Sequence, residues 1–366
     1  MIDYTADSLN YLLAKLCRVL QLSPSQHESA VDKYEGVGRW LGGPGSPLES
    51  LATSIYAQGS MALGTTVKPI EDTEHDLDLI FEVDRVNLAP ADLHRIVEAR
   101  VQENNLYKQR LVHPAPPRCL RLKYAGDFHL DIVPARRDPA RGATAIEVPD
   151  RKLKCWVPNN PREYQTWFER QSASLVIMEK AAIQPVPALM ASEQKPPLKL
   201  VVQLMKRHRD IVFGRAIGAP SSILLTTMAA RSYRGDASVA DALARILAAM
   251  ENEIRSSWPG RISVPNPTNI AEDLCSKFSD EEYARFAQWV VAFSDEFRKL
   301  KELTGLEKIA AVLKALFGEN ITTSVIKSYV QRLDEARKAG GLRYGASGLG
   351  VTGGMLVPPH TFHGEE

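Results

Sequence analysis

Residues 55–83 constrain the fold more than any other stretch, because they join a small-residue turn to two carboxylates on one strand. A short apolar run, 55–57, ends at Gly59-Ser60. A turn of small residues that opens a helix leaves backbone N–H groups available to a phosphate. Asp76-Leu77-Asp78 begins an alternation of apolar and polar residues that is typical of a strand with one buried face. Two carboxylates on the other face repel each other without a cation, and hard oxygen ligands of this kind suit Mg²⁺.

A second strand brings a third acid to the same face. Residues 118–134 are predicted to form a hairpin whose turn is Ala125-Gly126-Asp127. In the second strand of the hairpin the apolar residues alternate with polar ones, so Asp131 projects away from the core, as Asp76 and Asp78 do. Three carboxylates on adjacent strands that face a phosphate-binding turn match the requirements of two-metal phosphoryl transfer. Singly, each acid could be an ordinary exposed strand residue.

These residues carry a family resemblance. Gly59-Ser60, Asp76-x-Asp78 and Asp131 resemble the catalytic signature of the polymerase-β-type nucleotidyltransferases. The fuller wording, Gln58-Gly59-Ser60 followed by Gly64-Thr65-Thr66-Val67-Lys68-Pro69, resembles the cGAS/DncV-like family, whose members make cyclic nucleotide signals. The resemblance extends over nearly the whole chain and implies a cyclic di- or trinucleotide synthase.

The resemblance also implies roles for single residues. Asp76 and Asp78 would hold two Mg²⁺ ions, with Mn²⁺ as an alternative. Asp131 would complete the metal site and help to deprotonate the attacking ribose hydroxyl. Ser60 and the amides beside it, including that of Gly59, would bind the β- and γ-phosphates of the donor nucleotide, although Ser60 could also be only an N-cap. Gln58 would contact the nucleotide or simply brace the turn.

The second half of the chain is predicted to be helical and to supply further phosphate contacts. Candidate helices are 161–180, 197–213, 221–233, 236–252, 280–300, 305–317 and 320–338. Lys199 and Lys206 share a face of the second of these, where lysines are usually solvated, but the resemblance implies contacts with donor phosphates. Ser221 and Ser222 are predicted to begin a helix that also contacts the triphosphate.

The predicted architecture is an α+β, bilobal enzyme of the polymerase-β type, in which a mixed sheet with helices packs on a helical lobe and the active site lies between them. We expect a catalytic lobe with N-terminal helices at 1–160, a helical lobe at 161–338 and a flexible tail at 339–366. Within the catalytic lobe, 134–160 is rich in Pro, Arg and Asp and is predicted to be irregular. By resemblance, the tail is either disordered or the target of an accessory conjugating protein.

Charge and composition exclude several other classes. The 45 basic and 44 acidic residues balance to a net charge of +1, which is not the basic footprint of a protein that binds long nucleic acids. The sequence contains neither a membrane-length apolar run nor a signal peptide, which predicts a soluble, cytoplasmic protein. The four cysteines are scattered and contain no zinc-type pair.

The function predicted from these observations is synthesis of a cyclic oligonucleotide from ATP, GTP or other nucleoside triphosphates, with release of pyrophosphate. Resemblance to bacterial members implies antiphage signalling in which a downstream effector reads the product. Two alternatives remain: a linear oligonucleotide synthase or nucleotidyl-transferring modifier of RNA or protein, and a catalytically silent nucleotide-binding regulator. The three acids disfavour the silent regulator, because such a protein has no reason to keep repelling carboxylates.

Overall fold

The structure is a computed structural model of the whole chain and describes residues 8–70, 75–84, 87–124, 128–172, 184–214, 218–345, 348–351 and 355–358. These residues form two compact units. The sheet unit comprises 22–190 and 264–276, and the helical unit comprises 1–21, 191–263 and 277–366. Each unit is therefore built from segments that are not contiguous in the chain. The lobes expected from the sequence are contiguous ranges, and their boundaries stay a prediction.

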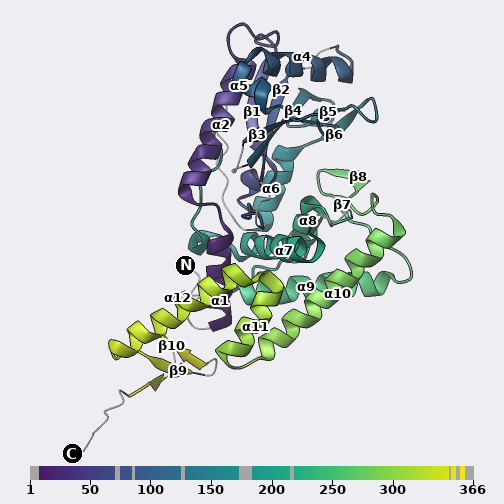
Figure 1. Cartoon of the computed structure of the whole chain (residues 1–366). Coiled ribbons are helices and arrows are strands. Elements are labelled where there is room, and N and C mark those ends of the chain that lie inside the picture. The colour runs from purple at the N-terminus through teal and green to yellow at the C-terminus, as the bar shows by residue number, and fades with distance from the viewer. Residues whose placement is uncertain are drawn as a thin grey trace, which may run out of the picture. The chain divides into compact units, whose positions relative to one another are not determined.

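The sheet unit consists of strands and the helices that cover them (Figure 1). Its elements are α2 (Pro24–Gly42), β1 (Ala52–Gln58), α3 (Gly59–Leu63), β2 (His75–Val83), α4 (Pro90–Glu103), α5 (Asn105–Arg110), β3 (Leu120–Tyr124), β4 (Phe128–Arg137), β5 (Ile146–Asp150), β6 (Cys155–Asn159), α6 (Pro161–Gln171), β7 (Pro265–Asn266) and β8 (Asn269–Asp273). Helix α2 begins as its sequence predicts, with Ser23 as N-cap, Pro24 at the first helical position and a capping box to Gln26.

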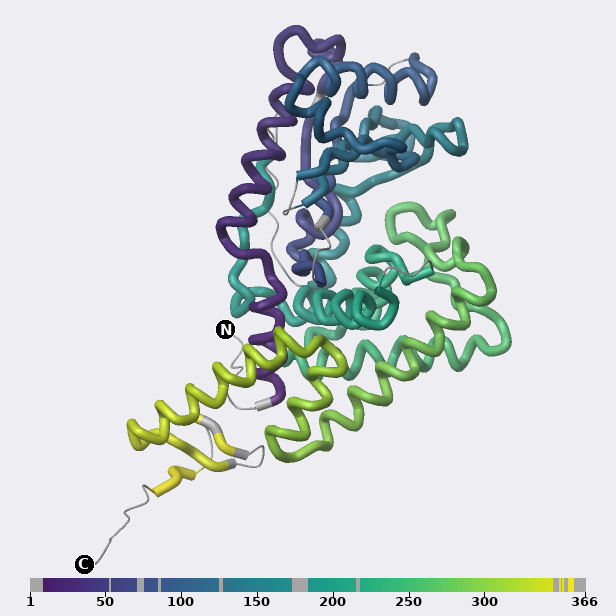
Figure 2. The backbone as a smooth tube through the Cα atoms, viewed as in Figure 1, coloured from purple at the N-terminus to yellow at the C-terminus, as the bar shows by residue number. Residues whose placement is uncertain are grey.

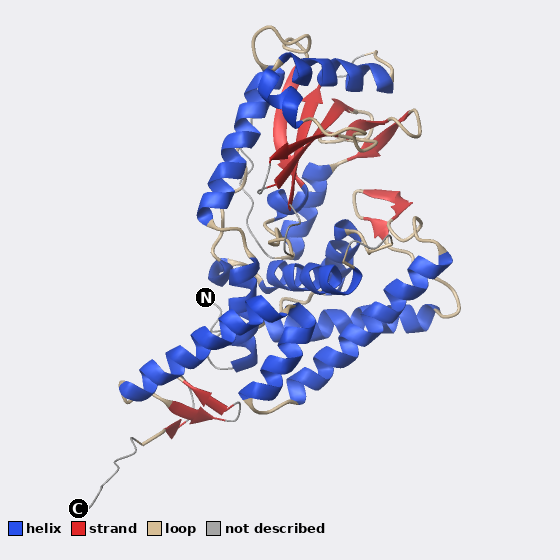
Figure 3. Cartoon of the chain, in the orientation of Figure 1, coloured by secondary structure: helices blue, strands red, loops and turns tan. Residues whose placement is uncertain are grey.

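Six of the described strands form one mixed sheet, drawn in red in Figure 3. Its order is β1-β2-β4-β5-β6, and β3 pairs with part of β4. The central pair, β2 and β4, is parallel, while the other pairs are antiparallel. The connection between β2 and β4 contains helix α4, as parallel strands require a crossover.

The alternation along β2 and β4 divides the sheet into a deeply buried face and a functional face. Leu77, Leu79 and Phe81 are buried in the same cluster as residues of α2 and α4, which cover this face. A smaller apolar cluster, which includes Ile80 and Val133, lies in the other alternation phase, the phase of Asp76, Asp78 and Asp131. The face predicted for the acids is thus the face they occupy.

The helical unit is built on packed helices (Figure 2). Its elements are α1 (Ser8–Leu20), a short 3₁₀ turn (Ser192–Gln194), α7 (Pro197–Phe213), α8 (Ser222–Ser232), α9 (Val239–Ser257), α10 (Asp280–Glu302), α11 (Leu306–Phe317), α12 (Glu319–Lys338), β9 (Arg343–Gly345), β10 (Gly348–Gly350) and β11 (Met355–Leu356). Helix α1 packs against α7, α9 and α12, which explains why it belongs to this unit.

His208 is a buried titratable side chain of the helical unit. His208 on α7 stacks on Phe293, and its Nδ1 accepts a hydrogen bond of 3.0 Å from Nε1 of Trp289. Burial lowers the pKa of His208 to about 3. The imidazole is therefore neutral at physiological pH and is a packing group of the core.

Several segments differ from the expectations. The stretch 134–160, predicted to be irregular, contains the end of β4 and both β5 and β6, which form a hairpin despite a proline in each strand. Within the predicted tail, the short strands β9, β10 and β11 pair with one another. Helix α6 ends at Gln171, and residues 173–183, like 359–366, lie outside the described residues. No described helix combines the length and the apolar character needed to cross a bilayer.

Candidate active site

The parallel pairing of β2 and β4 brings two acids into register. Asp78 and Asp131 are direct partners on the two neighbouring strands, and Asp76 is the partner of His129. Neighbouring strands lie about 4.8 Å apart, so the carboxylates of Asp78 and Asp131 start from adjacent positions on one face. Asp131 is 6% exposed and nearly buried, whereas Asp76 is exposed at the end of the row.

The Gly-Ser turn lies beside the same acids. Strand β1 ends at Gln58, whose partner on β2 is Asp78. Gly59 follows with a φ of +63°, and a Cβ atom there would collide with the carboxylate of Asp78. The N-cap of α3 is Gln58, without a side-chain hydrogen bond, so the alternative interpretation of Ser60 as an N-cap is wrong. The turn thus brings its backbone close to Asp78, which only glycine permits here.

Arg121 connects two of the acids. Its Nε and Nη2 donate hydrogen bonds of 2.7 and 2.6 Å to the two oxygens of Asp131, and Nη2 also lies 3.2 Å from Oδ1 of Asp76. Arg121 is the cross-strand partner of Asp131 on β3, so the hairpin itself delivers the guanidinium to this face. The hydrogen bond to Asp131 raises the pKa of Arg121, which stays fully charged.

Two further side chains border the acids. Nδ1 of His129 lies 3.5 Å from the same oxygen of Asp76. Although the side chain of Asp76 is 53% exposed, desolvation by the residues around it raises its pKa, an effect that the positive charge of Arg121 opposes and the negative charge of Asp131 reinforces. Cys119 is buried against Asp131, and burial together with that negative charge raises the pKa of its thiol. A cation nearby would favour the charged form of Asp76.

The acids have the chemistry of a divalent-metal site. Among the described residues, no group of three or more His, Cys, Asp or Glu side chains converges as a formed metal centre. The oxygens of Asp131 face Arg121. One nitrogen of Arg121, Nη2, lies between Asp131 and Asp76, so the two acids are close enough to share one cation. Carboxylate oxygens are the ligands that Mg²⁺ and Mn²⁺ take in proteins, so the donor set fits such an ion.

The lysines predicted to bind phosphate lie on α7 of the helical unit. Lys199 and Lys206 are 6% and 5% exposed, so they do not form the solvated face that lysines on a helix usually form. Lys195, just before the helix, is buried as well, and burial lowers its pKa to about 8. Three nearly buried lysines in and beside one helix are unusual in a core, because burying ammonium groups is costly.

The serines predicted to bind phosphate form the start of α8. Ser221 is its N-cap, and its hydroxyl accepts a hydrogen bond from the N–H of Leu224. Ser222, the first helical residue, accepts one of 3.0 Å from Nη1 of Arg209, which also bonds the carbonyl of Pro220. Both serines are exposed. The predicted start of a helix at Ser221 and Ser222 is confirmed. A contact between these serines and a triphosphate stays a prediction.

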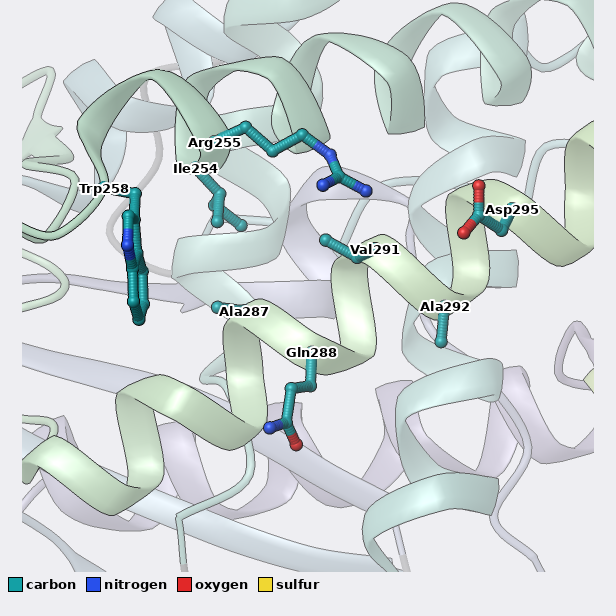
Figure 4. Close-up of a pocket in the computed structure, with 8 residues that line it drawn as sticks. All are labelled: Ile254, Arg255, Trp258, Ala287, Gln288, Val291, Ala292 and Asp295. Carbon is teal, nitrogen blue, oxygen red and sulfur yellow. The ribbon is translucent and has the colours of Figure 1, made fainter.

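A pocket of the helical unit lies at a different place (Figure 4). It has a volume of about 610 Å³ and lies between the end of α9 and α10, with Ile254, Trp258 and Val291 among its lining residues. None of the predicted site residues lines it. It offers no pair of acids and is not a candidate for phosphoryl transfer.

Sequence reasoning missed four residues of these sites: Arg121, His129, Cys119 and Lys195. A signal for Arg121 was present, because counting outward from the turn at 125–127 places it opposite Asp131. Cys119 and Lys195 carry no such signal, since their burial depends on the packed fold. The predicted turn 125–127 and the side chain of His75, next to Asp76, lie outside what the structure describes.

Comparison with known proteins places this geometry in context. Residues 8–171 match the family model of the Second Messenger Oligonucleotide or Dinucleotide Synthetase domain. The chain is 31% identical to a c-di-GMP synthase of Roseivirga ehrenbergii, with 96% of each chain covered. It is 29% identical to the cyclic dinucleotide synthase CdnG of Bradyrhizobium diazoefficiens, with 97% of this chain and 90% of that protein covered.

Solved structures share the fold. The structure of CdnG from Bradyrhizobium diazoefficiens in complex with GTP superposes with a TM-score of 0.74 at 26% identity, over 89% of this chain and 99% of that one. A structure of DncV from Escherichia coli bound to 3′-deoxy GTP has a TM-score of 0.59 at 14% identity, over 84% and 94% of the two chains, and shares the fold alone.

A mixed sheet with acids on its parallel pair, in the fold of these structures, defines a nucleotidyltransferase of the polymerase-β type, which confirms the predicted fold class. Within that class, the identity to the Roseivirga enzyme over nearly the whole chain decides the family. The chain belongs to the cGAS/DncV-like nucleotidyltransferases, as its sequence predicted.

Proposed function

We propose that the protein makes a cyclic dinucleotide from two nucleoside triphosphates, and that GTP is a substrate. The observation that carries the proposal is the register of Asp78 with Asp131, with Asp76 on the same face and the Gly59 turn against Asp78. The names of two relatives, a c-di-GMP synthase and CdnG, support a cyclic dinucleotide product, and the GTP complex of CdnG supports the base.

The acids would act on the reacting oxygen and hold the cation. Asp76, Asp78 and Asp131 would bind Mg²⁺ or Mn²⁺, which stabilises charge on the attacking and leaving oxygens when bound. Asp131 would accept the proton of a ribose hydroxyl on the first nucleotide, while the oxygen of that hydroxyl attacks the α-phosphorus of the second nucleotide. The bond from that phosphorus to the pyrophosphate oxygen breaks, and pyrophosphate leaves. A second transfer of the same kind closes the ring.

The remaining predicted residues would hold the donor nucleotide. The amides at Gly59 and Ser60 would bind the β- and γ-phosphates, while Gln58 holds the turn. The buried ammonium groups of Lys199 and Lys206 and the start of α8 at Ser221-Ser222 would add positive charge for the triphosphate. Both lysines lie on one helix and share a face of it, which supports this role.

The product assay tests this function directly. Purified protein is incubated with Mg²⁺ and all four radiolabelled triphosphates, and products are treated with phosphatase before chromatography and mass spectrometry. We expect a phosphatase-resistant product with the mass of a closed dinucleotide ring when GTP is present. The Asp76→Asn/Asp78→Asn double variant should form none. Phosphatase-sensitive ladders would instead establish a linear synthase, and omitting each triphosphate in turn identifies the bases.

Antiphage signalling through an effector, and an accessory protein that acts on the C-terminal residues, follow from the family resemblance and are part of this proposal. The protein would be expressed in cells with its neighbouring genes and challenged with phage. We expect protection that the Asp76→Asn/Asp78→Asn variant abolishes. Equal plaque counts for both proteins would contradict the defensive role while leaving the synthase activity intact.

A further inference from the structure

Arg121 occupies the position of a cation between two acids of the candidate site. One nitrogen, Nη2, lies 2.6 Å from Oδ2 of Asp131 and 3.2 Å from Oδ1 of Asp76. A second, Nε, lies 2.7 Å from the other oxygen of Asp131. The guanidinium therefore bridges carboxylates on two neighbouring strands and uses both oxygens of Asp131.

This ion pair is strong enough to matter to any other ligand of Asp131. The carboxylate is nearly buried, and the guanidinium is only about a quarter exposed, with 27% of its side chain accessible. A two-point pair between arginine and a carboxylate is among the stronger polar contacts in proteins. Breaking such a pair without replacing it leaves a buried charge without compensation, which is costly.

We propose that Arg121 competes with the divalent cation for Asp131 and Asp76, and so sets the metal affinity of the site. The inference rests on the proposed function, in which these acids hold Mg²⁺ or Mn²⁺. A divalent ion that takes oxygens of both acids meets the positive charge of Arg121 at the same place. Metal binding therefore includes the release of the guanidinium from at least one acid, and the cost of that release weakens binding.

A second role for Arg121 predicts the opposite result. If the guanidinium permanently orients Asp131 toward the metal, its removal lets the carboxylate rotate and metal binding weakens. If it competes, removal of its charge strengthens metal binding. The sign of the change in affinity therefore separates a competitor from an orienting residue.

The experiment measures Mn²⁺ binding to the full-length protein by electron paramagnetic resonance, with calorimetry as a second method. Arg121→Gln removes the charge, and Arg121→Lys keeps it but removes the two-point contact. Arg118→Gln is the matched control, because Arg118 also bonds a buried acid, Asp150, at 2.7 Å, outside the site. We expect Arg121→Gln to bind Mn²⁺ about tenfold more tightly than the wild type, while Arg118→Gln is unchanged. Arg121→Lys should stay near the wild type.

Stability gives a readout that does not depend on catalysis. Without added metal, both Arg121→Gln and Arg118→Gln should melt about 5 °C or more below the wild type, because each leaves an acid without its partner. Saturating Mn²⁺ should close the gap in melting temperature between Arg121→Gln and the Mn²⁺-bound wild type, whereas Arg118→Gln should stay below the wild type by the same margin as without metal. Should Arg121→Gln be unfolded without metal, Mn²⁺ should restore its folding.

The outcomes separate the two levels of the proposal. Equal or weaker Mn²⁺ binding by Arg121→Gln, or no recovery of its stability, overturns the competition while leaving the metal site in place. Mn²⁺ binding that Asp76→Asn/Asp78→Asn does not abolish, or no binding by either the wild type or Arg121→Gln, overturns the metal site itself.

Discussion

Both the backbone conformation at position 59 and the nearby carboxylate of Asp78 require glycine there. Gly59 has a φ of +63°, which L side chains rarely adopt, and a Cβ atom would also collide with the carboxylate of Asp78. Gly45, in a loop of the same unit, has a φ of +78° with no heavy atom near the place of a Cβ. The two glycines share the backbone requirement and differ in the contact with the site.

This pair of glycines gives a prediction for the site. Gly59→Ala and Gly45→Ala should each cost about 1 kcal/mol of the free energy of unfolding, because both put alanine at a positive φ. Only Gly59→Ala should displace Asp78, and product formation should fall about 100-fold or more. The measurements are urea unfolding and the rate of product formation. A Gly59→Ala enzyme with full activity would show that the turn and Asp78 do not form one site.

Asp150 shows how a single buried acid couples stability to pH. Nε of Arg118 donates a hydrogen bond of 2.7 Å to one of its oxygens, and the N–H groups of Lys152 and Leu153 donate to the other. Burial opposes ionisation of Asp150, but the bond from Arg118 and these amides outweigh it, so its pKa lies below the ordinary value of 3.8. A lowered folded-state pKa gives stability above pH 3.8 that is lost as the pH falls through the folded value.

Asp150→Asn should therefore lose about 2 kcal/mol of the free energy of unfolding at pH 7, the contribution of hydrogen bonds to a charged group. The difference from the wild type should shrink only as the pH falls below 3.8 and through the lowered folded-state pKa of Asp150, where the wild-type carboxyl becomes neutral too. Chemical unfolding at pH 7 and pH 3 measures it. Asp92, which pairs with Arg95 on the surface of α4, is the control, and Asp92→Asn should change little at either pH. A loss of stability in Asp150→Asn that is the same at both pH values would show that the charge of Asp150 does not cause it.

At the scale of elements, local patterns predicted some parts of the chain well. The alternation along 75–83 gave both the strand β2 and the face of its acids, since a strand half buried in a core must alternate. The start of α2 is marked by a local pattern as well, because Ser23, Pro24 and Gln26 form an N-cap and capping box. In contrast, β5 and β6 each contain a proline, Pro149 and Pro158, and such residues argue against strands by propensity alone.

Other elements could not be predicted, because their stability comes from the packed fold. Strands β9 to β11 have two or three residues each, which is too short for any period to be visible. The burial of Lys199 and Lys206 depends on the helices around α7, although their shared face was evident from their spacing. The acids and the turn were predicted as neighbours, whereas the contact of Arg121 with two acids needed the side-chain geometry.

Helix α8 gives a prediction at this scale. Ser221 caps it, and Ser238 caps α9 in the same way, accepting a hydrogen bond from the N–H of Asp241. Ser221→Ala and Ser238→Ala should each cost about 1 kcal/mol of stability through the lost cap. Only Ser221→Ala should raise the KM for the donor triphosphate, by about tenfold, the effect of one hydrogen bond to a charged group. Equal KM values in both variants would remove the start of α8 from the nucleotide site.

At the scale of the whole molecule, the chain order and the packing order differ. Residues 1–21, at the start of the chain, belong to the helical unit. Residues 264–276, in the second half of the chain, belong to the sheet unit. Sequence periodicity predicts where a helix lies and which of its faces is apolar. It does not predict which unit that face packs against, because each unit has an apolar core. The assignment of α1 was therefore decided by long-range packing, with α7, α9 and α12 around it.

The helical unit should depend on α1 more than its place at the start of the chain suggests. Leu12, Leu13 and Leu16 are fully buried, and each Leu→Ala change in a core costs about 2–5 kcal/mol. Together they approach the total stability of about 5–15 kcal/mol of a typical protein, so the triple alanine variant should lose the fold of this unit. Arg18→Ala, at an exposed position of the same helix, is the control and should change little.

Hydrogen exchange followed by mass spectrometry locates the damage, because it reports protection peptide by peptide. In the triple variant, peptides from α7, α9 and α12 should lose protection, since these helices contact α1. Peptides from β2 and β4 should keep theirs, because their core is formed by α2, α4 and the sheet itself. Equal loss in the strands would mean that the two units fold as one cooperative body, and that the packing of α1 stabilises the acids as well as the helices.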